Sequence, residues 1–341
     1  MALTTIGSAG GSSARSITEG LTRRGIDARS KVVEGLLVAS LTASLLILVV
    51  LVVDIVQRSW PVWTERPGDF LRDGLNSAST SSAGVFSAVR GTIILAVIVG
   101  VVAFPLGIAC AVYLEEYATK SRFASWTRVN VRNLAGVPSI VYGLLGLGIF
   151  VKALNGLGEP ANDLQGSGFF GLRWLGNLLN LLSGNSGRNI FAGGLALSAL
   201  VLPIVVITAS EALRAVPRSI REGALGVGAT QWETVRHHVL PAAAPGILTG
   251  TVLSLARATG EAAPLLLVGA VTGTLITGDK SFVEQLSGPF TALPVAIFSY
   301  ARQAGDDWRA VTGAAALVLL VLVLIMNGFA IALRNRYDRK W

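Results

Sequence analysis

The chain has 341 residues, of which 52% are hydrophobic and only 14% charged, and its mean hydropathy is +0.62. These values exclude an ordinary soluble domain and predict a membrane protein. Basic loops and attraction to anionic lipid account for the formal net charge of +8, so we expect no nucleic-acid binding. The single cysteine, Cys110, excludes an internal disulfide, and the adjacent His237 and His238 would point apart on a helix, so we expect no metal site.

The first 32 residues are rich in Gly, Ser and Arg and lack the apolar core of a signal peptide. We expect residues 1–32 to form a mobile cytoplasmic arm. The alternative is an amphipathic helix on the membrane surface over residues 17–31. A first transmembrane helix is predicted at residues 33–57, followed by a Ser- and Thr-rich external loop at residues 58–85.

Apolar runs long enough to cross a bilayer, roughly 20 residues each, recur along the chain. The predicted fold is therefore all-α, a polytopic bundle of six transmembrane helices. The last five helices belong to a core over residues 86–335, and residues 336–341 form the C-terminus. The clearest parts of the six predicted spans are residues 35–53, 91–114, 133–151, 189–210, 242–273 and 311–333.

Basic residues are distributed unevenly between the two sides of the predicted spans. Of the 28 Lys and Arg residues, 17 fall in the N-terminal arm, residues 115–132, residues 211–241 and the C-terminus, which the spans place on one side. Ten lie on the other side, across longer loops. Because cytoplasmic loops retain Lys and Arg, we expect both termini to lie in the cytoplasm.

The stretch S-L-A-R-A-T-G-E-A-A-P at residues 254–264 places two charges inside the fifth span. An Arg in a span costs roughly 2.5 to 3.5 kcal/mol unless it is paired or faces water. Arg257 and Glu261 are four residues apart and would share one helical face, which Gly250 and Ser254 extend. One interpretation is an ion pair that locks two helices, and the other is a polar stripe that serves transport.

The segment R-E-G-A-L-G-V-G-A-T-Q-W-E-T-V-R-H-H-V-L-P at residues 221–241 lies between the fourth and fifth spans. It predicts a short helix, a tight bend at Gly228, and a second short helix from about Gln231 to Val239 that Pro241 stops. An exposed helical elbow is suited to docking. An ordinary interhelical loop is the alternative.

The spacing in this segment resembles the EAA loop of ABC importer permeases, which inserts into a groove on the ATPase subunit. Three residues separate Ala224 from Gly228, and eleven separate Gly228 from Leu240. Two positions depart from the family pattern, with Gly223 where Ala is usual and His238 where an aliphatic residue is usual. The resemblance implies that the coupling residues are Glu222, Gly223, Ala224, Gly228, Leu240 and Pro241.

Four more stretches narrow the resemblance. They are N-L-A-G-V-P-S-I-V-Y-G-L at residues 133–144, E-A-L-R-A-V-P-R-S-I-R-E at 211–222, R-A-T-G-E-A-A-P-L-L at 257–266 and A-L-P-V-A-I-F at 292–298. Together they resemble the A-type permease subunits of high-affinity phosphate ABC importers, the PstA-type family. The resemblance covers about residues 90–335 and implies the fold of a type I ABC importer permease in a bacterial cytoplasmic membrane.

This resemblance implies that the chain forms half of a path for inorganic phosphate, with Arg257, Glu261 and Ser254 lining it. An Arg contact to phosphate oxygens is charge-assisted and can be bidentate. The implied partners are a homologous second permease (PstC-like), an ATPase dimer (PstB-like) that binds ATP and Mg, and an extracytoplasmic phosphate-binding protein (PstS-like). The chain itself would hold no cofactor and would not be an enzyme.

Other classes of protein fit the sequence less well. The stretch G-T-L-I-T-G-D-K-S at residues 273–281 resembles a P-loop, but Asp279 separates its second Gly from its Lys. A permease for another oxyanion, such as sulfate or molybdate, would keep the same elbow. A secondary transporter or channel would leave the elbow unexplained. A membrane enzyme fits least, because the predicted spans bring no nucleophile and base to facing positions.

Overall fold

The computed structural model describes residues 28–118, 121–157, 162–164, 175–177, 179–180, 183, 187–275 and 286–337. The elements in these ranges are all helical, so the predicted all-α fold is confirmed. Most of the predicted N-terminal arm and most of the C-terminal residues 336–341 lie outside the described residues. By its internal contacts the chain divides into Met1–Asp54 and Ile55–Trp341.

Helix α2 (Ala28–Glu65) supplies all the described structure of the first unit. From Val32 to Leu51 its apolar side chains are exposed on every side, including Leu36, Leu46 and Val49, as expected of a helix surrounded by lipid. The prediction that this helix ends at residue 57 is wrong, because the helix continues past Arg58 to Glu65. The charge of Arg58 does not break the backbone hydrogen bonds of the helix. Pro67 disfavours helical geometry at the residue before it, so the helix ends there.

Within the described ranges, six helices are long and apolar enough to cross a membrane, which is the predicted number. They cover Lys31–Glu65, Phe86–Tyr117, Ser139–Gly156, Ile190–Ala215, Gln231–Gly260 and Asp306–Arg336.

Two of the predicted spans are interrupted. The run at residues 133–151 is divided between α5 (Arg122–Ala135) and α6 (Ser139–Leu145), because Pro138 cannot continue the preceding helix. The run at residues 242–273 breaks after Gly260. Beyond α6 the helix continues through the wider π-turns of η3 (Gly146–Val151) and then α7 (Lys152–Gly156).

Helix α10 (Ile190–Ala215) packs along both α4 (Phe86–Val112) and α13 (Leu240–Gly260). Glycines allow the close approach, since a Cβ atom on Gly194 would lie 2.5 Å from Ile98 and one on Gly250 would lie 2.4 Å from the Thr208 hydroxyl. Small residues have this role at helix contacts in lipid, where close van der Waals packing replaces the hydrophobic effect.

One end of the second unit is closed by α3 (Pro67–Arg72), η1 (Thr80–Ser82) and α16 (Leu293–Ala301). Helices α3 and α16 share a buried core with α17 (Asp306–Tyr337), which includes Phe70 and Tyr300. Arg66 donates hydrogen bonds to carbonyls of the η1 segment, at 2.7 Å for that of Ser81, and the Tyr300 hydroxyl donates to the Gly84 carbonyl at 2.7 Å. Much of the predicted loop at residues 58–85 is therefore packed structure.

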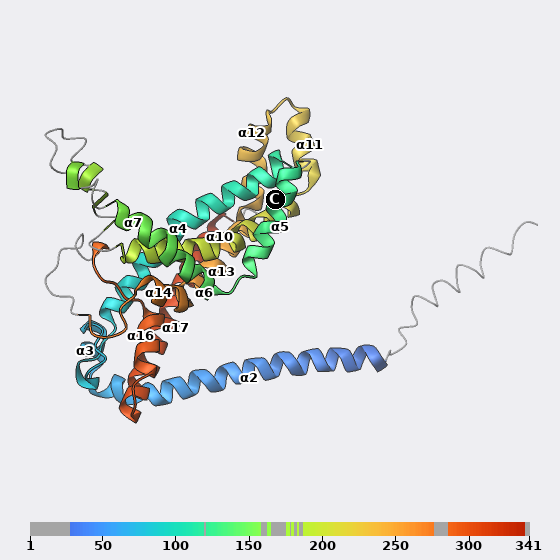
Figure 1. The fold of residues 1–341 in the computed structure, drawn as a ribbon. Coiled ribbons are helices and arrows are strands. Elements are labelled where there is room, and N and C mark those ends of the chain that lie inside the picture. Colours follow the sequence, from blue (N-terminus) through green and yellow to red (C-terminus); the bar gives the residue numbers. More distant parts are fainter. Residues whose placement is uncertain are drawn as a thin grey trace, which may run out of the picture. The chain divides into compact units, whose positions relative to one another are not determined.

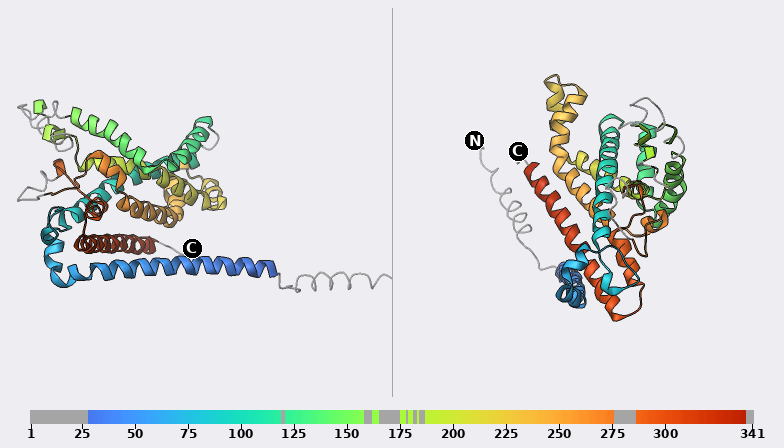
Figure 2. Two further views of the ribbon diagram at one scale, coloured as in Figure 1. Left: turned by 60° about the horizontal axis from the view of Figure 1, so that its bottom comes forward. Right: turned by 90° about the vertical axis from the view of Figure 1, so that its left-hand side faces the viewer.

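We call this the cap end of the unit. Helices α11 (Arg218–Gly226) and α12 (Gln231–Thr234) lie at the opposite end, beside α5 (Figure 1). A second direction of view shows the same separation, with the elbow at the top and α16 at the bottom (Figure 2, right). The helices α4, α10 and α13 connect the two ends.

Candidate transport path and coupling elbow

The elbow at residues 211–241 has the predicted bend. Helix α11 ends at Gly226, and Gly228 has a φ of +90°, a backbone conformation that favours glycine. The second arm begins with a capping box, in which the Thr230 side chain accepts from the Glu233 amide and the Glu233 side chain accepts from the Thr230 amide. The predicted helix–bend–helix is confirmed.

The prediction that Pro241 stops the second arm is wrong. After α12 the chain forms the π-turn η4 (Val235–Val239) and enters α13 directly at Leu240, so Gln231–Gly260 is one long helix. Pro241 lies two residues after this π-turn, and such local π adjustments are one way in which a membrane helix tolerates the missing amide of a proline. The second arm of the elbow is thus a direct extension of a membrane helix.

The predicted coupling residues differ in exposure. Ala224 is buried, whereas Glu222, Gly223 and Gly228 are exposed at the outside of the bend. Beside them Val227 is 86% exposed. Leu225 and Trp232 are exposed as well. A group of exposed apolar side chains of this kind is typical of a docking surface.

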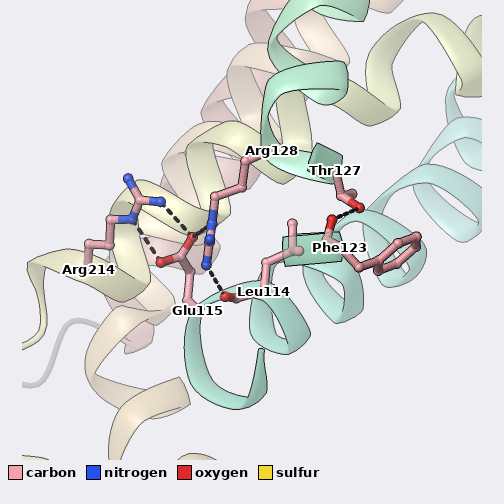
Figure 3. A network of polar contacts seen from close by, with 6 residues as sticks. All are labelled: Leu114, Glu115, Phe123, Thr127, Arg128 and Arg214. Carbon is pink, nitrogen blue, oxygen red and sulfur yellow. Dashed lines mark hydrogen bonds and ion pairs between the residues drawn. The ribbon is translucent and has the colours of Figure 1, made fainter. Parts of the chain in front are cut away.

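Two adjacent glutamates at the end of α4 hold the elbow, and the sequence analysis missed both. They belong to the π-turn η2 (Tyr113–Tyr117). Glu115 accepts two hydrogen bonds from Arg214 of α10, both at 2.8 Å, and a weaker one from Arg128 of α5 at 3.4 Å (Figure 3). Arg128 also donates to the Leu114 carbonyl. Glu115 therefore joins α4 to α5 and α10.

Glu116 makes the contacts to the elbow. Its carboxylate accepts from Arg221 of α11 at 2.7 and 3.1 Å, and its backbone carbonyl accepts from the Gln231 side chain of α12. The signal in the sequence is the acidic pair at positions 115 and 116, which begins the otherwise basic segment of residues 115–132. These side chains border a cleft of about 820 Å³ between the end of α4 and the elbow.

The second candidate site lies where α13 ends. Arg257 is in the last turn of α13, and Glu261 follows the helix with an extended backbone, at φ −85° and ψ 120°. Helix α14 (Ala263–Val268) then begins with Pro264 in its first turn. The prediction of a continuous helix through both charges is wrong, because Gly260 and Pro264 favour a break between them.

The two charges nevertheless meet. The Arg257 Nε lies 3.5 Å from the Glu261 Oε1, and their side chains are 55% and 21% exposed. Ser254 does not share that exposed face, since it is fully buried and its hydroxyl donates to the Gly250 carbonyl at 2.8 Å. The accessible stripe of α13 runs through Leu253 to Arg257, and the path role of Ser254 stays a prediction.

The position of Arg257 along the bundle follows from its neighbours. Gly250 lies against Thr208, and Ala258 shares a buried cluster with Leu200 and Val201. The two helices are antiparallel, so later residues of α13 lie beside earlier residues of α10. Arg257 therefore lies opposite the middle of the 26-residue helix α10. An irregular backbone at such depth is tolerated in membrane proteins where it is buried in protein or lines a water-filled cavity.

Comparison with known proteins agrees with this arrangement of membrane helices, elbow and interrupted span. Residues 103–339 match the family described as the binding-protein-dependent transport system inner membrane component. The chain therefore belongs to this family of ABC transporter permeases, which are multi-pass membrane proteins.

Particular relatives support the narrower resemblance found in the sequence. The phosphate transport system permease protein PstA of Xylella fastidiosa (strain Temecula1) is 32% identical over 255 residues, which cover 74% of this chain and 76% of the relative. The phosphate transport system permease protein PstA 1 of Mycobacterium tuberculosis (strain H37Rv) is 32% identical over 253 residues, covering 74% and 70%. The PstA-type resemblance is confirmed.

Solved structures agree on the fold. A chain from the crystal structure of a bacterial alginate ABC transporter, in complex with a periplasmic protein that binds an alginate pentasaccharide, superimposes with a TM-score of 0.61. It is 14% identical, and the match covers 92% of this chain and 97% of that one. At such low identity the likeness concerns the fold alone.

Proposed function

We propose that this chain is the transmembrane permease subunit of an ATP-driven importer of inorganic phosphate and forms half of the translocation path. The observation that carries the proposal is the 32% identity to a phosphate transport permease over 74% of the chain. The family match over residues 103–339 includes the elbow and four complete candidate spans.

Arg257 is the residue proposed to contact phosphate. It is a cation opposite the middle of α10, more than half exposed and next to a helix break. An Arg–anion contact at about 4 Å is worth roughly 4 kcal/mol in an effective dielectric of 20, before the cost of removing water from both groups. The resulting weak site suits a transient passage. Glu261 competes for Arg257 and helps phosphate to leave.

The elbow is proposed to dock on a separate ATPase subunit, which binds ATP and Mg, so that this chain is not catalytic by itself. The support is the exposed bend at Gly228 with Val227 at its tip. Under this proposal the elbow end and both termini lie in the cytoplasm, and the excess of Lys and Arg in these segments supports that orientation. The P-loop-like stretch at residues 273–281 lies largely outside the described residues.

The remaining proposed partners are a homologous second permease and an extracytoplasmic phosphate-binding protein. One Arg on an exposed stripe of α13 supplies a single cationic side to a path. A second permease completes the enclosure. The cap end lies opposite the elbow (Figure 1) and is the surface proposed to meet the binding protein.

The test is uptake of labelled phosphate in a bacterial strain that lacks its own A-type permease and is complemented with this chain. The expected result is restored uptake that depends on ATP and is not reduced by excess sulfate or molybdate. Complementation of sulfate or molybdate uptake in the corresponding strains, without phosphate uptake, would contradict the proposed substrate.

A further inference from the structure

Glu116 connects both arms of the elbow to one point at the end of α4. Its carboxylate oxygens accept from the Arg221 guanidinium at 2.7 and 3.1 Å, and its carbonyl accepts from Gln231. The side chains of Glu116 and Arg221 are only 7% and 22% exposed. A bidentate pair of this kind fixes orientation as well as distance.

Arg221 has a second set of partners at the end of α10. It donates to the carbonyls of Leu213 and Val216, both at 2.8 Å. The last carbonyls of a helix have no partner within the helix, so Arg221 satisfies part of the α10 terminus. One guanidinium on α11 thus joins the ends of α4 and α10.

Glu115, the neighbour of Glu116, faces the rest of the bundle. It pairs with Arg214 of α10 and Arg128 of α5 (Figure 3). The two adjacent carboxylates divide the contacts, one set going to the elbow and the other to the membrane helices. One peptide bond joins Glu115 to Glu116, so a displacement of the elbow also acts on the contacts of Glu115 with α5 and α10.

We propose that Glu116 and Arg221 are positioning residues that make the elbow and the cytoplasmic ends of α4 and α10 move as one body. We call this pair the Glu116–Arg221 clamp. The inference rests on the proposed docking of the elbow to an ATPase. Without the clamp, α10 and α13 remain covalently attached to the elbow, but α4 loses its ion pair to α11.

The functional test uses the whole complex in proteoliposomes and measures phosphate transported per ATP hydrolysed. Glu116→Gln keeps the size of the side chain and removes its charge. The matched control is Glu65→Gln, the same chemical change at an exposed position of α2 near the cap end. We expect the transported phosphate per ATP to fall several-fold for Glu116→Gln and to stay at the wild-type value for the control. Arg221→Lys keeps the charge but cannot make the bidentate contact, and should give an intermediate ratio of phosphate to ATP.

The structural test does not depend on the substrate. The chain has one cysteine, so a Cys110→Ser background allows spin labels at Ser125→Cys on α5 and Ser219→Cys on α11, both exposed positions. In the wild-type clamp we expect one narrow distance distribution, unchanged between the nucleotide-free and ATP-bound complexes. Glu116→Gln should broaden it or make it depend on nucleotide.

An unchanged distance distribution in Glu116→Gln, or an unchanged phosphate-to-ATP ratio in an assembled complex, would overturn the clamp. Failure of the proposed function looks different. In that case the wild-type complex hydrolyses ATP but transports no phosphate, while the spin-label distances still report whether elbow and bundle move together.

Discussion

The Nε atom of Arg257 lies 3.5 Å from Oε1 of Glu261, although the helix that carries Arg257 ends between them at Gly260. In a continuous helix, residues four apart such as these would be held next to each other on one face. Here Glu261 has an extended backbone, so the ion pair does not depend on a continuous helix.

Arg257→Gln is expected to lower phosphate uptake at least tenfold, since a net loss of about 1.4 kcal/mol already corresponds to a factor of ten. The measurement is labelled uptake in complemented cells, with the amount of assembled complex determined in the same membranes. Arg122→Gln, at an exposed position of α5, is the control for removing an Arg. Uptake retained by Arg257→Gln would reduce the pair to a packing role.

Glu261→Gln tests the competing carboxylate separately. Without its negative charge, Arg257 holds phosphate longer, so we expect a lower KM together with a lower maximal rate in proteoliposome uptake. A structural ion pair predicts a different result. In that case Glu261→Gln and Arg257→Gln both lower the amount of complex, and KM stays the same.

Gly228→Trp is expected to leave the protein in the membrane and remove transport-stimulated ATP hydrolysis by the complex. The glycine has a φ of +90° and open space around it, so a bulky side chain obstructs docking rather than packing within the chain. Gly228→Asn is the control, because Asn tolerates positive φ better than other side chains. Coupled hydrolysis unchanged in Gly228→Trp would mean that the bend does not dock.

Gly250→Ala is expected to destabilise the contact between α10 and α13. The new Cβ would lie 2.4 Å from the Thr208 hydroxyl, and overpacking of this kind costs about 1–3 kcal/mol. Thermal unfolding of the purified complex measures the effect. Adding Thr208→Gly vacates the space and should restore part of the loss, whereas Gly68→Ala, with nothing nearby, should have no packing effect. Absence of rescue would indicate another cause.

Tyr300→Phe is expected to loosen the cap end. It removes the donor to the Gly84 carbonyl, and an unsatisfied buried acceptor costs about 1–3 kcal/mol. Burial raises the pKa of Tyr300 to about 12. Because this pKa is higher in the folded protein, the stabilisation is present below pH 10 and is lost between about pH 10 and 12. The difference in Tm between wild type and Tyr300→Phe should therefore shrink above pH 10. A difference that is constant with pH would contradict this assignment.

Much of the bundle could be predicted from the sequence because each feature is local. Apolar length gives the six spans, and the glycine and capping residues of the elbow give its bend. The errors were local as well. They arose at Arg58, Pro241 and the Gly260–Pro264 segment, where charge and proline were weighed without the hydrogen bonds that continue or end a helix.

The sequence by itself determined that this is a polytopic membrane protein with an elbow of the permease type, since hydropathy and spacing are properties of neighbouring residues. Only the tertiary structure decided which polar residues meet. It buried Ser254 and left Arg257 exposed. It also brought Glu116 to Arg221 across 105 positions of the chain. The physical reason is that such pairings depend on how α4, α10 and α11 pack, and no local pattern specifies contacts over such a separation.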